Sequence, residues 1–410
     1  MKKLIAILMM VALLMTMFAG CGQSAEAGQP AADTPAEAGK PADTAEPAEP
    51  IKIAYIGPLT GDNAEYGQTM SNAVQIAVED INAQGGYNGR MFELVSYDDK
   101  NDATEATTVA EKVCSDESIV AVIGHFSSGV AMAAAPVYEE YGMPYIAISA
   151  AHPDLCEGEF IFRNNALYDT EASSVLQTIA HKGATKYGIL VENSDAGVSV
   201  TTQIDAWLEQ FGDAYTPELV TIQRFDSGAT DMNAQIQEFI AAGCEVVYTN
   251  AAYAQVVPFI TQYRTYDQDV EFIISAACFS PAFLEAAGEN ANGCVLATSF
   301  FYGSPNEAVK AFVDKYVSKY GENPSNFCGQ SYDAAFSYFH AIQIAGSTDR
   351  DAIRQALYEV EFEGLTGAMA YNEVGECLKQ QTLVGIEDGK WVEHTGVLLS
   401  ASAYLEQLTK

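Results

Sequence analysis

Basic side chains are scarce in this sequence: 20 Lys and Arg stand against 55 Asp and Glu, which gives a formal net charge of −35 at pH 7. A surface this acidic repels nucleic acids and anionic lipid headgroups, so the charge balance argues against a polyanionic partner. The hydrophobic fraction of 49% is nevertheless ample for sizeable cores. At 410 residues the chain is long enough for two ordinary domains. We therefore expect a folded, acidic protein that binds no nucleic acid.

Paired cysteines are also missing. The eight cysteines, Cys21 among them, form no C-x-x-C pair, and no histidine stands near them at metal-ligand spacing. Such a pattern supports neither a disulfide framework nor a zinc site. We expect the cysteines after Cys21 to be mostly small apolar filler in the cores, and we expect no metal ion.

Signatures of catalysis are thin as well. There is no G-x-S-x-G turn, no phosphate loop with its Lys-Ser/Thr, and no G-x-G-x-x-G between a strand and a helix. The acidic stretch "YDDKNDATE" lacks the glycine and terminal glutamate of an EF-hand loop, so we expect a solvated loop in which Asp102 or Thr104 caps the next helix. The sequence therefore predicts neither an enzyme nor a cofactor. A hydrolase that acts on amides through His125 or His152 is the alternative.

The first residues, "MKKLIAILMMVALLMTMFAGCGQ", have the pattern of an export signal. Two lysines precede an apolar run that has about the length of a signal-peptide core and is short for a membrane-spanning helix. Small residues then precede Cys21, which resembles the lipobox of bacterial lipoproteins, where the signal (residues 1–20) is removed and the cysteine is lipidated. A plain secretory signal is the alternative. Residues 21–50 are rich in Ala, Pro and acids and poor in apolar side chains, so we expect a lipid-anchored disordered linker.

From Ile51 onward, strands and helices alternate. The nearly continuous apolar run "IVAVIGHF" indicates a parallel strand covered on both faces. An apolar stripe from Met70 to Ile81 predicts a helix that is closed by Gly85-Gly86. The other elements predicted in this half are the strands "IKIAYIGPL", "MFELVSYDD" and "PYIAIS" and the helices at "ATEATTVAEKVCS" and before Tyr141. This order predicts a doubly wound α/β sheet.

The same alternation restarts after "FIFRNNALYDT". The predicted strands are "KYGILVEN", "ELVTIQRF", "CEVVYTN", "EFIISA" and "GCVLATSFF". The predicted helices lie near 197–211, 230–242, 254–266, 281–287, 305–320, 327–346 and 349–360. The tail "LKQQTLVGIEDGKWVEH" predicts a hairpin that turns at Asp388-Gly389. The predicted fold is therefore α/β with two similar lobes and not one large sheet.

Two adjacent serines are candidates for a binding site. Ligands of open α/β sheets bind outside the carboxyl ends of the strands, so two lobes that face each other with those ends form a cleft. Ser127 and Ser128 follow the strand "IVAVIGHF" and precede a helix, which predicts that they face such a cleft. Capping of the helix at 129–141 is the alternative, and both roles can coexist because free helix N-terminal amides attract a carboxylate.

The stretches "IKIAYIGPLTGDNAEYGQTMSNAVQIAVEDINAQGGYNGRMFELVSYDDKND" and "VAVIGHFSSGVAMAAAPVYEEYGMPYIAISAAHPDL" resemble the branched-chain amino acid-binding protein family. Members of that family are type I periplasmic solute-binding proteins that deliver a ligand to an ABC importer. The resemblance runs from about Ile51 to the C-terminus and is weaker in the second half. It implies two Rossmann-like lobes around a ligand cleft, joined by three hinge crossings near 170, 299 and 376. The first lobe would comprise 51–170 with 299–376, and the second 171–298 with 377–410.

The resemblance also implies which residues bind the ligand. Tyr66 would cover the ligand, Ser128 would bind its carboxylate, and Ser149, Ala150 and Ala151 would flank its head. The family's threonine is missing at Ala151, and the acid that pairs with a ligand ammonium falls at Ala276. The remaining candidates from the resemblance and from the neighbouring loops are Phe126, Ser127, Asp195, Asn250, Tyr253 and Phe279.

These features together predict an extracytoplasmic lipoprotein, anchored to the bacterial cell membrane only through its lipid. It would capture a small solute by lobe closure and present it to the permease and ATPase subunits of an ABC importer. We expect a monomer; a ligand-sensing receptor component of the same fold is the alternative.

The ligand prediction follows from the missing acid. A buried ammonium needs a counter-charge, so either Asp195 supplies one or the ligand has no ammonium. The aromatic candidates, with Phe300 added to them, suit a flat or apolar ligand body. We therefore expect a small, largely apolar or aromatic compound with a carboxylate or amide group, and branched-chain amino acids are the second choice.

Overall fold

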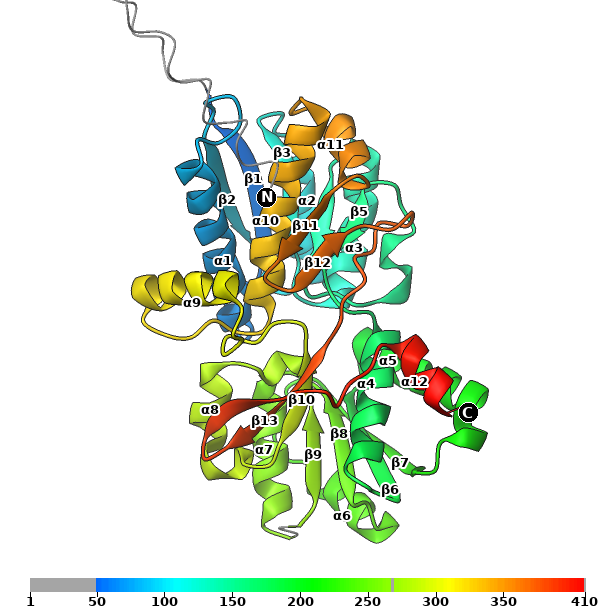
Figure 1. Cartoon of the computed structure of the whole chain (residues 1–410). Helices are drawn as coiled ribbons and strands as arrows, with labels where there is room; N and C mark the ends of the chain where they lie inside the picture. The colour runs from blue at the N-terminus through cyan, green and yellow to red at the C-terminus, as the bar shows by residue number, and fades with distance from the viewer. Residues whose placement is uncertain (1–48, 267–268, 409–410) are drawn as a thin grey trace, which may run out of the picture. The chain divides into compact units, whose positions relative to one another are not determined.

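The computed structural model describes residues 49–266 and 269–408. The predicted signal peptide (residues 1–20), Cys21 and nearly all of the predicted linker lie outside these residues. The described residues form two separate sheets, each with helices on its faces, and a short two-stranded hairpin (Figure 1). No helix in these ranges is both long and apolar enough to cross a membrane.

The first sheet has five parallel strands in the order β2-β1-β3-β4-β5. Its strands are β1 Ile51–Gly57, β2 Phe92–Asp98, β3 Ile119–Gly124, β4 Tyr145–Ala147 and β5 Ile161–Arg163. Every residue of β3 is buried, as its continuous apolar run predicts. From β1 the chain adds β2 on one side and then β3 on the other, and ligands of doubly wound sheets bind at this switch point.

Helices cover both faces of this sheet. On one face, α1 Ala64–Ala83 packs against α10 Phe327–Ala345, and α10 packs against α11 Arg350–Leu357. The other face is covered by α2 Ala103–Cys114 and α3 Ser128–Tyr141. The predicted end of α1 is confirmed, since Gly85 and Gly86 both adopt positive φ angles. Asp102 caps α2 by accepting hydrogen bonds from the amides of Thr104 and Glu105, which decides between the two predicted caps. We call this sheet with α1–α3, α10 and α11 the first lobe.

The second sheet has seven strands in the order β14-β13-β10-β9-β8-β6-β7. Its strands are β6 Lys186–Glu192, β7 Glu218–Phe225, β8 Val246–Asn250, β9 Glu271–Ile274, β10 Val295–Thr298, β13 Thr382–Glu387 and β14 Lys390–His394. The helices around it are α4 Tyr168–His181, α5 Asp195–Phe211, α6 Asn233–Ala242, α7 Tyr253–Arg264, α8 Pro281–Ala287 and α12 Ala401–Leu408. We call this sheet and these helices the second lobe. The β13–β14 hairpin turns at Asp388 and Gly389, both with positive φ, as predicted.

Some elements were not predicted from the sequence. They are β5, α4, α12 and the hairpin of β11 Glu361–Gly364 with β12 Gly367–Ala370. The inner face of α4 carries Ser173, Ser174, Gln177 and Thr178, all buried, so its apolar stripe is diluted. Because α4 begins shortly after the first sheet ends, a prediction without α4 also lacks the part of the binding site that lies on this helix.

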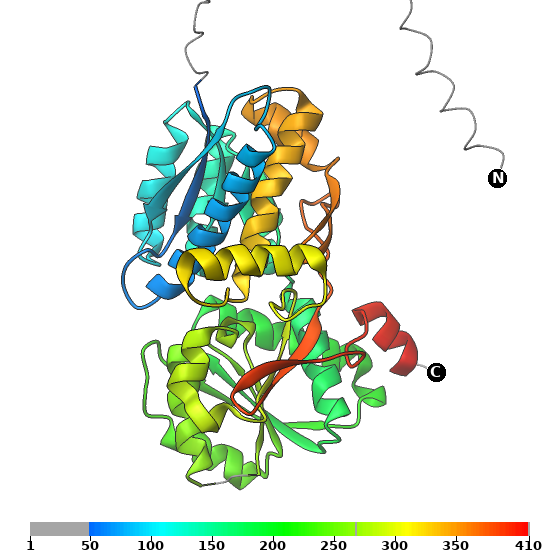
Figure 2. The ribbon, with the colours of Figure 1, turned by 60° about the vertical axis from the view of Figure 1, so that its left-hand side comes forward.

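The chain passes between the lobes after β5, after β10 and after β12 (Figures 1 and 2). Buried polar contacts fix the last passage. Arg163 at the end of β5 is fully buried, and its Nη2 lies 3.0 Å from Oε1 of Glu376. The buried Lys379 donates to Oγ1 of Thr366 at 2.6 Å, and that hydroxyl donates to Oδ2 of Asp333 at 2.6 Å. The last passage is therefore tied to the first lobe by largely buried polar groups.

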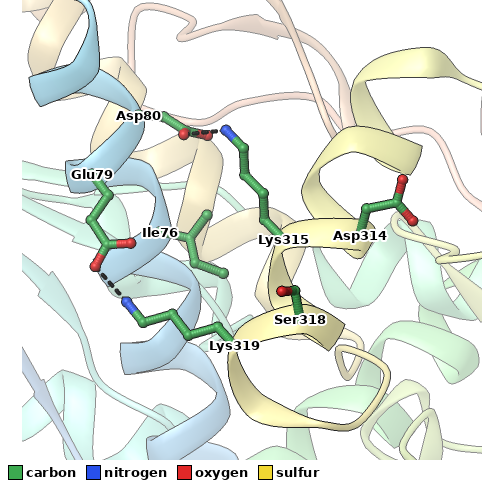
Figure 3. A pocket seen from close by; sticks show the side chains of 7 residues that line it. All are labelled: Ile76, Glu79, Asp80, Asp314, Lys315, Ser318 and Lys319. Atoms are coloured by element: carbon green, nitrogen blue, oxygen red, sulfur yellow. Dashed lines mark hydrogen bonds and ion pairs between the residues drawn. The ribbon is translucent and has the colours of Figure 1, made fainter.

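The segment that follows the second passage forms α9 Glu307–Tyr320, which contacts both lobes. Its apolar side packs into a core cluster of the second lobe. Its lysines pair with α1 of the first lobe: Lys315 with Asp80 and Lys319 with Glu79, as Figure 3 shows. Asp80 also accepts a hydrogen bond from the hydroxyl of Tyr332 at 2.9 Å.

Candidate functional site

The carboxyl ends of strands from both sheets meet at a cavity of about 830 Å³. The first lobe contributes residues that follow β3 and β4, and the second lobe contributes residues that follow β6, β8 and β9. This is the position at which open α/β sheets bind ligands, and the volume is within the usual range for small-molecule sites. The cavity is therefore the candidate binding site.

The first-lobe wall centres on the start of α3. Ser127 precedes the helix in an extended conformation, yet its side chain makes no capping hydrogen bond. The buried Ser128 accepts a hydrogen bond from the amide of Ala151 at 3.2 Å, and its Oγ lies 3.4 Å from the hydroxyl of Tyr168. Since neither serine caps α3, the amides of its first turn stay available to an anion. The alternative of capping alone is wrong for both residues.

Buried contacts hold this wall from behind. His125 is fully buried, with Nδ1 2.6 Å from Oδ2 of Asp99 and Nε2 2.7 Å from the hydroxyl of Tyr138. His152 accepts a hydrogen bond from the amide of Asp154 and so starts a short 3₁₀ helix. The two histidines have separate structural contacts and neither lines the cavity. The structure therefore gives no support to a hydrolase that uses either of them.

The loop after β4 is joined to the loop after β3. The hydroxyl of Ser149 lies 2.9 Å from the carbonyl oxygen of His125 and 2.8 Å from that of Phe126, and the amide side chain of Asn165 donates to the carbonyl of Ser149. Ser149 therefore uses its proton to fix the loop, although it lines the cavity. Ala151 also lines the cavity, whereas Ala150 is fully buried and does not.

Aromatic rings stack at one side of the cavity. Phe126 lines it, and Tyr66 stacks behind Phe126 with ring centroids 4.3 Å apart. The hydroxyl of Tyr66 accepts a hydrogen bond from the amide of Tyr253 at 3.1 Å, a contact between the lobes. Tyr66 and Tyr253 therefore support the ring that faces the cavity and do not line it themselves.

Two aromatic residues proposed from the sequence lie elsewhere. Phe279 is fully buried in the second-lobe core, where it packs against Tyr302 and Trp391. Phe300 is likewise buried, next to Phe312. Neither ring lines the cavity, so the expectation that they face the ligand is corrected. Their apolar environments in the core account for their position.

The second-lobe wall contains mostly small residues, among them Ala252 and Ala276. Asp195 lines this wall too, is exposed, and starts α5, whose cap is Ser194. A methyl group added at Gly129 would lie 3.1 Å from Oδ2 of Asp195. The carboxylate of Asp195 therefore lies next to the first turn of α3, on the side where a ligand anion is expected.

Sequence reasoning missed two acids that line the cavity, Glu171 and Glu192. Glu171, in the first turn of α4, lines the cavity and is only partly exposed. Its Oε1 accepts hydrogen bonds from the hydroxyl of Tyr248 at 2.6 Å and from the side-chain amide of Asn250 at 3.1 Å. Burial raises the pKa of the Glu171 carboxyl, and the two hydrogen bonds oppose that shift. The predicted site residue Asn250 thus acts together with Glu171.

A second cavity, of about 420 Å³, lies between α1 and α9 (Figure 3). Its carboxylates on α1, Glu79 and Asp80, are already paired with Lys319 and Lys315. It is therefore a weaker candidate than the larger cavity. Among the described side chains, no group of three or more His, Cys, Asp or Glu is arranged to bind a metal ion.

Comparisons with known proteins find a family and several relatives for this chain. The family model described as periplasmic binding protein matches residues 50–383. The leucine-, isoleucine-, valine-, threonine-, and alanine-binding protein of Pseudomonas aeruginosa is 28% identical over 331 residues, which are 80% of this chain and 87% of that protein.

Two solved structures are similar in fold. A branched-chain amino acid transporter substrate-binding protein from Streptococcus pneumoniae, in complex with isoleucine, has a TM-score of 0.77 and 24% identity, covering 84% of this chain and all (100%) of that one. An ABC transporter solute-binding protein from R. palustris, in complex with benzoate, has a TM-score of 0.75 and 20% identity, covering 84% and 95%. These likenesses confirm the predicted two-lobe fold.

The family match spans both lobes and all strands that contribute to the cavity. The relatives are named as binding proteins, and the family acts outside the cytoplasm. The chain therefore belongs to the periplasmic binding protein family, among the type I solute-binding proteins that include the branched-chain amino acid-binding proteins of ABC importers.

Proposed function

We propose that this protein is the extracytoplasmic substrate-binding lipoprotein of an ABC importer. In this proposal it captures a small amino acid-like solute, or another solute with a carboxylate or amide group, by closure of its lobes. The cavity carries the proposal, because hydroxyls and uncapped helix amides of the first lobe face an acid of the second lobe across it. A ligand that contacts both walls stabilises the closed form by its differential affinity for that form.

The ligand classes found on proteins of the same fold support a carboxylate. Isoleucine and benzoate, the ligands in the two similar structures, share that group and differ in the rest. In this chain Ser127 and the first turn of α3 are the natural partners of such an anion. The aromatic ring of Phe126 and the alanines of the second lobe leave room for an apolar body, either aliphatic or aromatic.

Two further parts of the proposal concern the chain as a whole. The lobes would comprise 51–170 with 299–376 and 171–298 with 377–410, with the hinges at the three passages between the sheets. Lipidation at Cys21, followed by the acidic linker, would leave the folded lobes outside the cell membrane and next to the permease.

A ligand panel tests the binding proposal. The chain from Gly22 onward would be purified, freed of bound ligand by partial unfolding and refolding, and tested by thermal shift and calorimetry. The panel would contain the common amino acids, their deaminated acids, benzoates and the matching amides. At 100 times the Kd, a true ligand stabilises the folded state by about 2.7 kcal/mol. If no member of the panel raises Tm or releases heat, the proposed ligand class is wrong.

Import is tested separately from binding. In the source bacterium, deletion of the gene should abolish high-affinity uptake of the labelled ligand, and the intact gene should restore it. Unchanged uptake, with loss of a cellular response to the same ligand, would instead favour a receptor component.

A further inference from the structure

The first turn of α1 contacts the second lobe beside the ligand cavity. The hydroxyl of Tyr66 accepts a hydrogen bond from the backbone amide of Tyr253 at 3.1 Å, and the centroids of the two rings lie 5.8 Å apart. Glu65, the residue before Tyr66, is half-buried, and its carboxyl group hydrogen-bonds with the side chains of Tyr253 on α7 and Ser280, the N-cap of α8. A carboxyl group of the first lobe therefore binds hydroxyls of the second.

Both hydroxyls are available as donors to this carboxyl group. The buried Ser280 accepts a hydrogen bond from the amide of Phe283 at 3.1 Å, which leaves its own proton for Glu65. Burial and the hydrogen bond with Glu65 raise the pKa of Tyr253 to about 12, so this phenol keeps its proton at neutral pH. Oε2 of Glu65 is buried and has no hydrogen-bond partner among the described residues. The contact between the lobes therefore satisfies the carboxyl group only in part.

The surroundings of Glu65 disfavour its negative charge. Among the described residues, no Lys, Arg or His forms an ion pair with it. The titratable groups that act on it are Glu322, which follows α9, the phenol of Tyr253 on α7 and that of Tyr66 on its own helix. Burial raises the pKa of the Glu65 carboxyl and the charge of Glu322 adds to this shift, while the hydrogen bonds with the two hydroxyls oppose it.

We propose that Glu65 is a latch between the lobes: its neutral carboxyl group favours the contact with Tyr253 and Ser280, and its carboxylate opposes that contact. Glu65 does not line the cavity, so it acts on ligand affinity through lobe closure and not by touching the ligand. This inference rests on the proposed function, in which closure retains the ligand. It adds to that function a dependence of ligand capture on pH.

The direction of the pH dependence follows from the two states of the contact. When the lobes separate, water reaches Glu65 and its pKa returns toward the ordinary value for a glutamate. The form with the lobes in contact therefore binds the proton more tightly. Its extra stability is complete below the ordinary pKa and is lost as pH rises through the raised pKa. Because each unit between the two pKa values is worth about a tenfold change in an equilibrium constant, ligand affinity should fall several-fold from mildly acidic to neutral pH.

Glu65→Gln tests the latch because glutamine has nearly the shape of the neutral carboxyl group and does not ionise. Calorimetry at about pH 5 and about pH 7.5, with the tightest ligand of the panel, measures the affinities of both proteins on either side of the expected transition. The variant should bind almost as the unmodified protein does at the acidic pH and several-fold more tightly at the neutral pH. Titration of Glu171 and of the ligand is common to both proteins and cancels in the ratio of their affinities.

Tyr253→Phe tests the same contact from the second lobe. It removes one donor to the carboxylate, so it should weaken binding at neutral pH in the unmodified chain. Its effect should be smaller when it is combined with Glu65→Gln, because no carboxylate is then present.

Glu285→Gln is the matched control. Glu285 lies on α8, the helix that Ser280 caps, is exposed and does not line the cavity. This variant removes one negative charge from the second lobe and should leave the affinity unchanged at both pH values. If it raises affinity at neutral pH as much as Glu65→Gln does, the effect is general electrostatics and the latch is wrong.

Ligand-free protein gives a second measurement. Small-angle X-ray scattering at neutral pH should give a smaller radius of gyration for Glu65→Gln than for the unmodified protein, because more molecules have their lobes in contact. If Glu65→Gln binds ligand no more tightly than the unmodified protein at neutral pH, the latch is wrong while the binding function stands. If no member of the panel binds, the proposed function fails, and an unchanged radius of gyration then refutes the latch as well. If Glu65→Gln does not fold, unchanged neutral-pH affinity of Tyr253→Phe refutes the latch.

Discussion

Ser127 and Ser128 are neighbours with different contacts, so their alanine variants should separate binding from stability. Ser128→Ala removes the acceptor of the buried Ala151 amide and the hydroxyl next to Tyr168. A buried amide without a partner costs about 1–3 kcal/mol, and for domains of this size each kcal/mol lowers Tm by about 2–4 °C. Ser127→Ala removes no capping hydrogen bond, so its Tm should stay within about 1 °C of the original value.

Ligand affinity, unlike Tm, should fall in the Ser127→Ala variant. On the proposed function, Ser127 donates to the ligand carboxylate, and loss of a hydrogen bond to a charged group weakens binding by about 1.5–3 kcal/mol, or roughly 10- to 150-fold. Calorimetry at one temperature, together with thermal unfolding without ligand, measures both quantities for each variant. A Ser127→Ala variant that loses several degrees in Tm and binds ligand normally would show that Ser127 is a structural cap, contrary to the present geometry.

Three other substitutions test separate features. Asp195→Asn should bind carboxylate ligands a few-fold more tightly in calorimetry, because the carboxylate of Asp195 lies next to the start of α3 and repels a ligand anion there; weaker binding would contradict this. Tyr66→Phe removes the acceptor of the Tyr253 amide between the lobes and should weaken ligand binding by about 0.5–1.5 kcal/mol, without change in the spectroscopic signature of the fold. Cys21→Ser should move the mature protein from the membrane fraction to the soluble fraction, and tight membrane association of that variant would refute lipidation at this cysteine.

The first lobe could be predicted well because its signals are local. The apolar run of β3 is buried on both faces as its composition indicates, and Ser127 and Ser128 follow it after two residues in the sequence. The carboxyl end of a buried parallel strand, next to a helix, is a position that sequence alone can identify. Phe126 and Ser149, which also line the cavity, came from the resemblance to the family and not from this local signal.

The second lobe could be predicted less well because its signals depend on distant partners. Two of the buried polar residues of α4 find partners far along the chain: Ser174 donates to Gln381, and Gln177 bonds the backbone of Leu399. Without those partners the pattern does not resemble a buried helix face. The helix was therefore not predicted, and Glu171 on its first turn was not considered. Phe279 is an error of the opposite kind. It follows a strand and is aromatic, which favours a ligand contact, yet it packs in the second-lobe core against Tyr302 and Trp391.

The two walls of the cavity therefore make different contributions to selectivity. The first-lobe wall offers hydroxyls and backbone amides, which bind any carboxylate, and its loop is fixed by the buried contacts of His125 and Ser149. On the proposed function, this wall meets the ligand carboxylate, and the ring of Phe126 also meets the ligand body. Further discrimination, on the same proposal, comes from the second lobe, where alanines leave space for the ligand body and Glu171 adds a carboxylate whose Oε1 accepts a hydrogen bond from Tyr248. An anion site on one lobe opposite small side chains on the other would let the ligand body change while its carboxylate stays bound, so substitutions in the second-lobe wall are expected to alter specificity.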